Sequence, residues 1–292
     1  MGEEKVALLA LLHHSEPAVS WAQVRADLLE GASPLALLEG PGLIGVDVSE
    51  QVARAREDLT RWESAGIHVL TPLDEDYPAQ LLSVHDFPLV LFGRGAVAHD
   101  YRSAAIVGSR EFSQGGQMFA DRLATALAED GVTVVSGLAR GIDGTAHRAA
   151  LRAGGRTVAI IGNGLDHVYP AEHRELQRTI AERGLVLSQF RPTTRSSRQT
   201  FPQRNITMSA YSAMTVIAEA QEASGTRIQA NAAIKHARPL ILTEQVVGRT
   251  SWGREFAEGN YDVTVVATAD EARTAVQDVL SRTQHSLQLA EA

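Results

Sequence analysis

The sequence predicts an α/β fold, with a mainly parallel sheet that helices cover on both faces and a small all-helical unit before it. Three short runs rich in Val, Ile and Ala support this, at residues 104–107, 132–135 and 157–161. Each run is followed by a glycine-rich loop and then by a segment with helical periodicity. Such alternation is typical of parallel sheets, because each parallel pair needs a crossover connection. Short length and β-branched content favour strand over buried helix.

Before residue 66 the pattern predicts helices only, at residues 6–14, 21–30, 34–38 and 50–65. In the last of these, Val52, Ala55, Leu59 and Trp62 share one face. The glycine-rich segment 40–45 resembles the loop of a helix-hairpin-helix unit, whose N–H groups can hold a DNA phosphate. A plain interhelical turn is the favoured interpretation.

Four further strands are expected, at residues 185–188, 214–218, 239–243 and 263–267, which makes about seven in all. Helices are expected at 226–237 and 270–280. The predicted organisation is a helical domain of the SAM or helix-hairpin-helix kind, a connecting segment, an α/β domain and a polar tail, at residues 1–65, 66–100, 101–282 and 283–292.

The loops after the first three strands predict a phosphate site. They contain Gly108-Ser109-Arg110, residues 136–144 with Arg140, and residues 162–166 with two glycines. All three follow the carboxyl ends of strands, the edge at which open parallel sheets bind ligands. Glycine lets backbone N–H groups approach an anion closely, and the helix that follows adds a positive end. A guanidinium suits bidentate contact with phosphate oxygens. An ordinary turn is the alternative for any single loop.

Composition and missing motifs exclude several classes of function. Neither G-x-G-x-x-G nor the Walker pattern occurs, which argues against dinucleotide-dependent hydride transfer and ATP hydrolysis. The chain has no cysteine, which excludes disulfides and thiolate chemistry and fits a reducing, cytoplasmic location. The apolar segment 6–12 is too short for a signal peptide or a membrane span.

Charge is unevenly distributed along the chain. The 27 Lys and Arg residues against 35 Asp and Glu residues give a formal net charge of −8, which repels a polyanion at long range. Residues 183–218, however, contain no Asp or Glu and carry Arg183, Arg191, Arg195, Arg198 and Arg204. Segment 190–205 lacks apolar periodicity and is predicted to be a mobile surface loop that tracks a phosphate backbone. A solvated linker is the alternative.

These residues resemble the DNA-processing protein A family (DprA, also called Smf). Its motifs are present as GSR at 108–110, SGLARGID at 136–143 with His147, Gly162 through Tyr169-Pro170, FPQRN at 201–205 and SGT at 224–226. The segment from Gly66 to Gly93 resembles the family's lead-in to its sheet, so the similarity covers about residues 60–245. The sequence is expected to represent a member without the winged-helix domain that many members carry.

The resemblance implies a Rossmann-like domain that binds single-stranded DNA without base preference and forms a homodimer. It also implies that the strand is handed to a RecA-type recombinase in natural transformation and recombination. The family has no established catalytic activity, and no cofactor or metal is expected. Phe201 is expected to stack on a base, a contact worth about 1–3 kcal/mol, or else to pack in the core. The DNA- or phosphate-binding residues expected are Gly108, Ser109, Arg110, Ser136, Gly137, Arg140, Gly141, Gly162, Gly164, Arg195, Arg198, Phe201, Arg204, Asn205, Ser224, Gly225 and Thr226.

The chain departs from the family pattern after Asn205, at Gln189 and at Glu244-Gln245. These departures leave a second function open, a sensor of a nucleotide or nucleotide-derived ligand in a defence or regulatory system. Unlike a strand binder, a sensor saturates with a mononucleotide.

Enzymatic alternatives are weaker. In phosphoribohydrolases with the motif P-G-G-x-G-T-x-x-E a glutamate is the acid or base, but here that position is Gln229, and only Glu219 or Glu222 can stand in. A Ser-His-Asp set from Ser109 or Ser136 with His147 and Asp143 lacks the nucleophile elbow. Asp143 is better explained as a helix N-cap, and His147 as a cap or packing residue.

Overall fold

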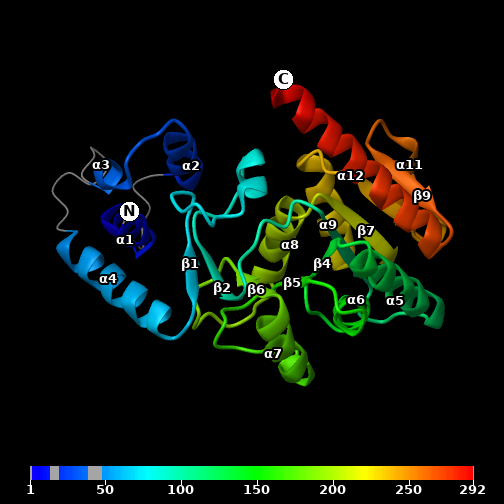
Figure 1. The fold of residues 1–292 in the computed structure, drawn as a ribbon, viewed down its shortest axis with the longest axis horizontal. Coiled ribbons are helices and arrows are strands. Elements are labelled where there is room, and N and C mark those ends of the chain that lie inside the picture. Colours follow the sequence, from blue (N-terminus) through cyan, green and yellow to red (C-terminus); the bar gives the residue numbers. More distant parts are fainter. Residues whose placement is uncertain (1, 14–19, 39–47, 292) are drawn as a thin grey trace.

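The computed structural model describes residues 2–13, 20–38 and 48–291 (Figure 1). The glycine-rich segment 40–45, considered above as a helix-hairpin-helix loop, lies outside these residues.

A single sheet, with helices on both faces, forms the centre of the molecule, and the predicted α/β fold is confirmed. Its strand order is β1-β2-β6-β5-β4-β3-β7-β8-β9. All neighbouring pairs from β6 to β9 in this order are parallel. At the other edge, β2 pairs antiparallel with β6, and β1 pairs antiparallel with β2. The strands are β1 (His68–Leu70), β2 (Leu91–Gly95), β3 (Ser103–Gly108), β4 (Thr133–Ser136), β5 (Thr157–Ile160), β6 (Leu185–Ser188), β7 (Met214–Glu219), β8 (Leu240–Thr243) and β9 (Val263–Val266).

The expected count of about seven strands, beginning at residue 104, is wrong, because β1 and β2 come from the segment interpreted as a connection. β1 has only three residues, and β2 contains Gly93 and Gly95, which weaken a strand pattern. Gly95 has φ +117°, and a Cβ there would lie 2.4 Å from the carbonyl oxygen of Gly184. Gly95 therefore lets β2 pass closely beside the start of β6.

Two layers of helices cover the sheet. The layer on one face consists of α5 (Gln114–Glu129), α6 (Ile142–Arg152), α7 (Arg174–Arg183) and α12 (Ala269–Glu291). The layer on the other consists of α8 (Thr200–Tyr211), α9 (Gly225–Lys235), α10 (Glu244–Arg249) and α11 (Ser251–Glu258). Side chains of β3 alternate between them, since Ala104 and Ile106 join the core of α5, α6 and α12, whereas Ala105 and Val107 join the opposite core.

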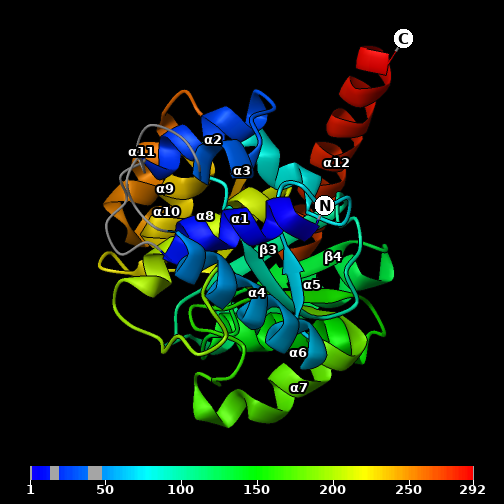
Figure 2. The same cartoon turned by 90° about the vertical axis from the view of Figure 1, so that its left-hand side faces the viewer.

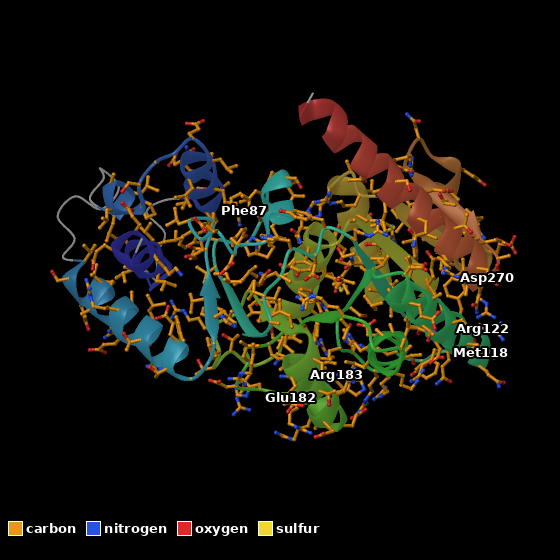
Figure 3. The ribbon with its side chains drawn as sticks, in the orientation of Figure 1. Phe87, Met118, Arg122, Glu182, Arg183 and Asp270 are labelled. Atoms are coloured by element: carbon orange, nitrogen blue, oxygen red, sulfur yellow. The ribbon has the colours of Figure 1, made fainter. Side chains whose placement is uncertain are left out.

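The N-terminal helices lie beyond the β1 edge of the sheet, at the blue end of the ribbon (Figures 1 and 2). They are α1 (Gly2–His13), α2 (Trp21–Leu29), α3 (Pro34–Leu38) and α4 (Ser49–Ser64). Trp62 of α4 meets Phe92 of β2 edge to face, with ring centroids 4.9 Å apart. Phe87 is fully buried and lies between α2 and the sheet (Figure 3). One hydrophobic core therefore runs from the N-terminal helices into the sheet.

β3 and β7 are neighbours, and the chain leaves them toward opposite layers, β3 to α5 and β7 to α9. This divergence opens a crevice at the carboxyl ends of the two strands, where open α/β sheets bind ligands.

The C-terminal helix is longer than predicted. α12 continues to Glu291, so the expected polar tail at 283–292 is helical through residue 291. Its Gln, Leu, Ala and Glu residues are good helix formers although the segment is polar. None of the helices in the described ranges is both long and apolar enough to cross a bilayer.

Replacing Phe87 with Ala should lower the free energy of unfolding by about 3–5 kcal/mol, because a cavity would open between the N-terminal helices and the sheet. Urea unfolding measures this loss. Leu29→Ala is the control, since Leu29 is 57% exposed and its loss should change stability by no more than about 0.5 kcal/mol. Equal effects of the two substitutions would contradict a shared core.

Candidate functional site

A cavity of about 450 Å³ occupies the crevice between β3 and β7. Three segments surround it: the end of β3 with its loop, the first turn of α8, and the loop from β7 into α9. Ala139 in the loop before α6 and Asp143 in the first turn of that helix complete it. The lining residues are Val107, Gly108, Ser109, Arg110, Glu111, Ala139, Asp143, Phe201, Pro202, Arg204, Asn205, Gln221, Ala223, Ser224, Gly225, Thr226, Ile228 and Gln229.

Close backbone approach fixes the β3 loop. A Cβ on Gly108 would lie 2.6 Å from Cγ1 of Ile142 and 2.9 Å from the carbonyl oxygen of Glu219. Gly141 has φ +84°, and its Cβ would lie 2.4 Å from the carbonyl oxygen of Ser109. Only glycine fits both places. The first two predicted loops therefore touch, and their contact holds Ser109 and Arg110 at the cavity.

Arg110 is the exposed cation of the cavity. Its Cζ lies 5.2 Å from the ring centroid of Phe201, within cation–π range. Among the residues that the structure describes it forms no salt bridge, and the carboxyl group that it influences is that of Asp143. Phe201 is held from behind by Gly162, where a Cβ would lie 2.9 Å from its ring, and its centroid lies 5.4 Å from that of Tyr169. A free guanidinium thus sits on a braced aromatic ring.

Arg204 is buried and serves a different purpose. Its Nη1 donates to the carbonyl oxygens of Gly137 and, at 3.0 Å, Ile160, while Nε donates to Oδ1 of Asn205 at 2.9 Å. The predicted mobile loop at 190–205 is wrong for residues 200–205, which form the start of α8. The buried face of this turn is polar, so the search for apolar periodicity could not detect the helix.

Asp143 brings a carboxyl group into the wall of the cavity. It is buried, and its Oδ2 accepts the Ala139 N–H at 3.4 Å. The N-cap of α6 is Gly141, so the N-cap assignment of Asp143 is wrong. Burial raises the pKa of Asp143, while Arg204, the N–H groups of Ala139 and Gly137, and Arg110 act in the opposite direction. The pKa of Arg204 is lowered by its own burial, which Asp143 opposes.

Nine of the seventeen predicted binding residues line the cavity, and the others lie around it. Ser136 is fully buried and donates to the carbonyl oxygen of Ile106 at 2.6 Å. Arg140 is exposed and forms an ion pair with Glu172. Gly164 lies against the backbone of Arg191 and Pro192, and would bring a Cβ within 2.0 Å of the Arg191 carbonyl oxygen. Arg195 and Arg198 are exposed on the segment before α8 and do not line the cavity.

The α9 side supplies the fourth strand–loop–helix unit. The side chain of Ser224 caps α9 by accepting the Thr226 N–H at 3.0 Å. Nδ2 of Asn205 donates to the carbonyl oxygen of Gly225 at 3.2 Å, which ties α8 to α9. The prediction missed nine lining residues, which are Val107, Glu111, Ala139, Asp143, Pro202, Gln221, Ala223, Ile228 and Gln229. The strand–loop–helix pattern that indicated the first three loops also spans residues 214–230 and would have indicated four of them.

The residues of the enzymatic alternatives are engaged elsewhere. Glu219 accepts the N–H and hydroxyl of Ser113 at 2.9 and 2.8 Å, and Glu222 accepts those of Ser251. Neither lines the cavity. His147 is fully buried, where its Nδ1 lies 2.7 Å from Oγ1 of Thr157, and burial lowers its pKa to about 3. It is a packing residue, and no triad forms with Asp143. Within the described ranges, no group of three or more His, Asp or Glu residues is placed to hold a metal ion.

Comparison with known proteins decides the family. The model of the DNA recombination-mediator protein A family matches residues 68–277, from β1 into α12. The chain belongs to this family. The resemblance inferred from the GSR and SGLARGID motifs is thereby confirmed. Protein Smf of Synechocystis sp. is 34% identical over 250 residues, which cover 76% of this chain and 63% of that protein. The chain spans only 51–63% of the length of the first curated relatives it matches.

Two solved structures share the fold. The X-ray structure of DNA processing protein A from Streptococcus pneumoniae matches with a TM-score of 0.67 and 25% identity, over 91% of each chain. DNA processing protein A from Helicobacter pylori, described for its single-stranded DNA binding mode, matches with a TM-score of 0.64 and 25% identity. That match covers 73% of this chain and 96% of the other. The predicted Rossmann-like fold is confirmed.

Asp143 should make anion binding in the cavity depend on pH. As pH falls toward the raised pKa of Asp143, its protonation removes a negative charge from the wall, so sulfate should bind more tightly. Asp143→Asn keeps an acceptor for the Ala139 N–H and should bind sulfate roughly tenfold, or about 1.4 kcal/mol, more tightly than the wild type does at a pH above the pKa of Asp143. It should also abolish the pH dependence. Isothermal titration calorimetry measures both effects.

Glu111→Gln is the matched control, because Glu111 also lines the cavity but is exposed, where solvent screens its charge. Weaker sulfate binding by a folded Asp143→Asn protein would show that the Asp143 carboxylate does not oppose the anion.

Proposed function

We propose that this protein binds single-stranded DNA by its phosphates in the cavity between β3 and β7, without base preference. The observation that carries the proposal is the free guanidinium of Arg110, held over Phe201 at a cavity lined by Ser109 and the N-terminus of α9. Membership of the family and the single-stranded DNA binding mode described for the Helicobacter pylori protein support it.

The two ends of the cavity suit different parts of a nucleotide. Arg110 donates in a fork that matches phosphate oxygens, and the first turn of α9 adds a partial positive charge. Tyr169, which is 42% exposed and lies beside Phe201, offers a ring face on which any base can stack. Stacking is worth about 1–3 kcal/mol per base and tolerates any sequence.

In the proposed function, arginines close to the cavity attract the strand although the protein has a net charge of −8. Arg195 and Arg198 lie exposed on the segment that leads into α8, next to the turn that carries Phe201. In the proposed function they contact phosphates outside the cavity. Binding would then weaken as salt rises, because each neutralised phosphate releases counterions.

We further propose that binding, and no catalytic step, is the function of this site. The engagement of Glu219 and Glu222 with Ser113 and Ser251 supports this, since neither carboxylate faces the cavity. The homodimer and the transfer of the strand to a RecA-type recombinase in transformation and recombination are part of the same proposal, and family membership supports them.

One observation favours the second candidate, a sensor of a nucleotide-derived ligand. The cavity, at about 450 Å³, has the size of a pocket for a small molecule. The two candidates share the phosphate contacts of Arg110. They differ in the effect of ligand length, because the affinity of a strand binder increases with each added nucleotide and that of a sensor does not.

Arg110→Ala should weaken the binding of oligo-dT and oligo-dA by about the same factor, because the lost contact is to phosphate. The slope of log K against log salt should fall in magnitude by about 0.7, the value for one phosphate on a single strand. Fluorescence anisotropy of labelled strands at several salt concentrations measures both.

Arg183→Ala is the matched control, an exposed arginine at the far end of α7 (Figure 3). Unchanged strand affinity in a folded Arg110→Ala protein would remove the cavity from the binding site.

A further inference from the structure

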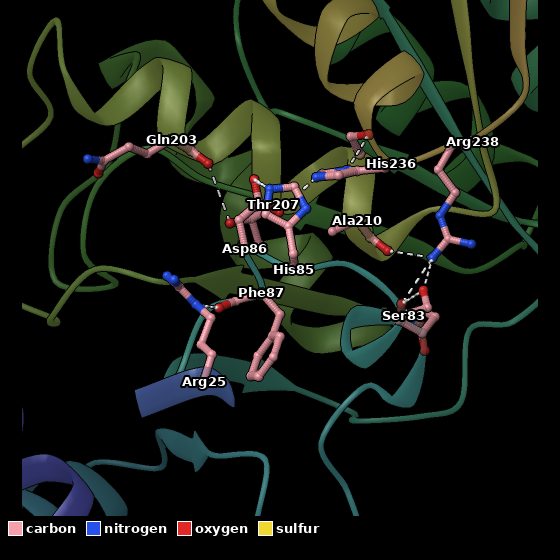
Figure 4. Close-up of polar contacts among 12 residues, drawn as sticks. Arg25, Ser83, His85, Asp86, Phe87, Gln203, Thr207, Ala210, His236 and Arg238 are labelled. Atoms are coloured by element: carbon pink, nitrogen blue, oxygen red, sulfur yellow. Dashed lines mark hydrogen bonds and ion pairs between the residues drawn. The ribbon is translucent and has the colours of Figure 1, made fainter. Parts of the chain in front are cut away.

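Residues 79–87, which we call the coupler, run between the N-terminal helices and the layer that contains α8 and α9 (Figure 4). The coupler begins with a 3-10 turn at Ala79–Ser83 and ends at the buried Phe87. From α2, the half-buried Arg25 donates through Nε to the carbonyl oxygen of Phe87 at 2.7 Å. The N-terminal helices are therefore tied directly to the backbone of the coupler.

On its other side the coupler contacts the end of α8 through a relay of three side chains. Oδ1 of Asp86 lies 2.8 Å from Nε2 of His236, and Nδ1 of His236 lies 3.0 Å from Oγ of Ser209. Because the carboxylate of Asp86 only accepts, Nε2 carries a proton. Hydrogen bonding to His236 lowers the pKa of Asp86. The relay links coupler, α9 and α8 in that order.

This connectivity is that of a catalytic triad, but the geometry excludes that use. Ser209 is fully buried within α8, and the side chain of His236 is 1% exposed. None of the three residues lines the cavity described above. Substrate cannot reach the hydroxyl, so the relay holds helices in place.

A second tie lies beside the first. Nη2 of Arg238 donates to the carbonyl oxygen of Gln80 at 3.0 Å, to Oγ of Ser83 at 2.8 Å and to the carbonyl oxygen of Ala210 at 3.2 Å. Burial lowers the pKa of Arg238. Two successive residues of α8, Ser209 and Ala210, are thus bonded through α9 and its C-terminal end to the coupler.

α8 connects these ties to the cavity. It is one helix of 12 residues, whose first turns present Phe201, Arg204 and Asn205 to the cavity and whose last turn carries Ser209 and Ala210. Asn205 and Ser209 stand one helical turn apart. A shift of the last turn therefore moves the residues that line the cavity, because a helix moves as a rigid rod over this length.

We propose that the coupler transmits the position of the N-terminal helices to α8, and that Asp86 and His236 are positioning residues for strand binding in the cavity. The expected change in strand affinity rests on the proposed function, whereas the coupling of α2 to α8 rests on the structure alone. Its consequence is that a partner or a substitution acting on α2 alters strand affinity without touching the cavity.

The test compares Asp86→Ala, Asp86→Asn and Arg25→Ala by strand affinity and by hydrogen exchange of α8 and α6. Asp86→Ala removes the acceptor of the relay, whereas Asp86→Asn retains an oxygen for the His236 N–H. We expect Asp86→Ala and Arg25→Ala to weaken binding of oligo-dT by about fivefold, the low end of coupling between sites. We also expect exchange to accelerate in α8 and not in α6. Asp86→Asn should restore both.

Arg56→Ala is the control, because Arg56 belongs to α4 and pairs with Glu3 on α1, away from the coupler. Unchanged exchange in α8 of both Asp86→Ala and Arg25→Ala would overturn the proposal. So would equal acceleration in every helix, which would mean only a general loss of stability. If Asp86→Ala does not fold, the strand affinity and the hydrogen exchange of Arg25→Ala alone test the proposal. If the wild type binds no strand while α8 still responds, the coupling stands and the proposed function fails.

Discussion

The buried guanidinium of Arg204 is the point at which the walls of the cavity meet. From the first turns of α8 it bonds the carbonyl oxygens of Gly137 after β4 and Ile160 at the end of β5, and it holds Asn205, which reaches Gly225 of α9. A buried cation is costly unless carbonyl oxygens and a carboxylate surround it, and Asp143 supplies the charge. Because each partner belongs to a different segment, this one residue sets the spacing of all of them.

With Arg204 committed to the scaffold, Arg110 remains for a ligand. The two arginines repel one another weakly, which contributes to the lowered pKa of Arg204. Burial raises the pKa of Asp143, and the positive charges of both arginines oppose that rise. Glycines at positions 108 and 141 allow the loops to touch so that the exposed guanidinium is presented over Phe201. In the proposed function, this division between a structural and an exposed cation gives an acidic protein a local site for an anion.

Much of this arrangement follows from the sequence, and the exceptions have physical causes. The strand–glycine–helix units at 104–166 predicted the parallel sheet and the loops at its carboxyl edge, because the apolar runs and glycines are local signals. β2 was missed because its glycines serve a close contact with Gly184 that only the fold creates. The start of α8 was taken for a loop because its buried face is polar, satisfied by carbonyl groups far away in sequence. Arg204, predicted to bind phosphate, lines the cavity, but its burial could not be foreseen.

The dependence of affinity on strand length distinguishes binding of a DNA strand from binding of a single nucleotide. Labelled oligo-dT strands of increasing length would be titrated at low and moderate salt, with free nucleotides as competitors. We expect affinity that rises with length and falls with salt, and poor competition by mononucleotides, because phosphates outside the cavity also contribute. Affinity that is already complete with a single nucleotide, or a nucleotide that binds where no strand does, would contradict strand binding and make the cavity a sensor.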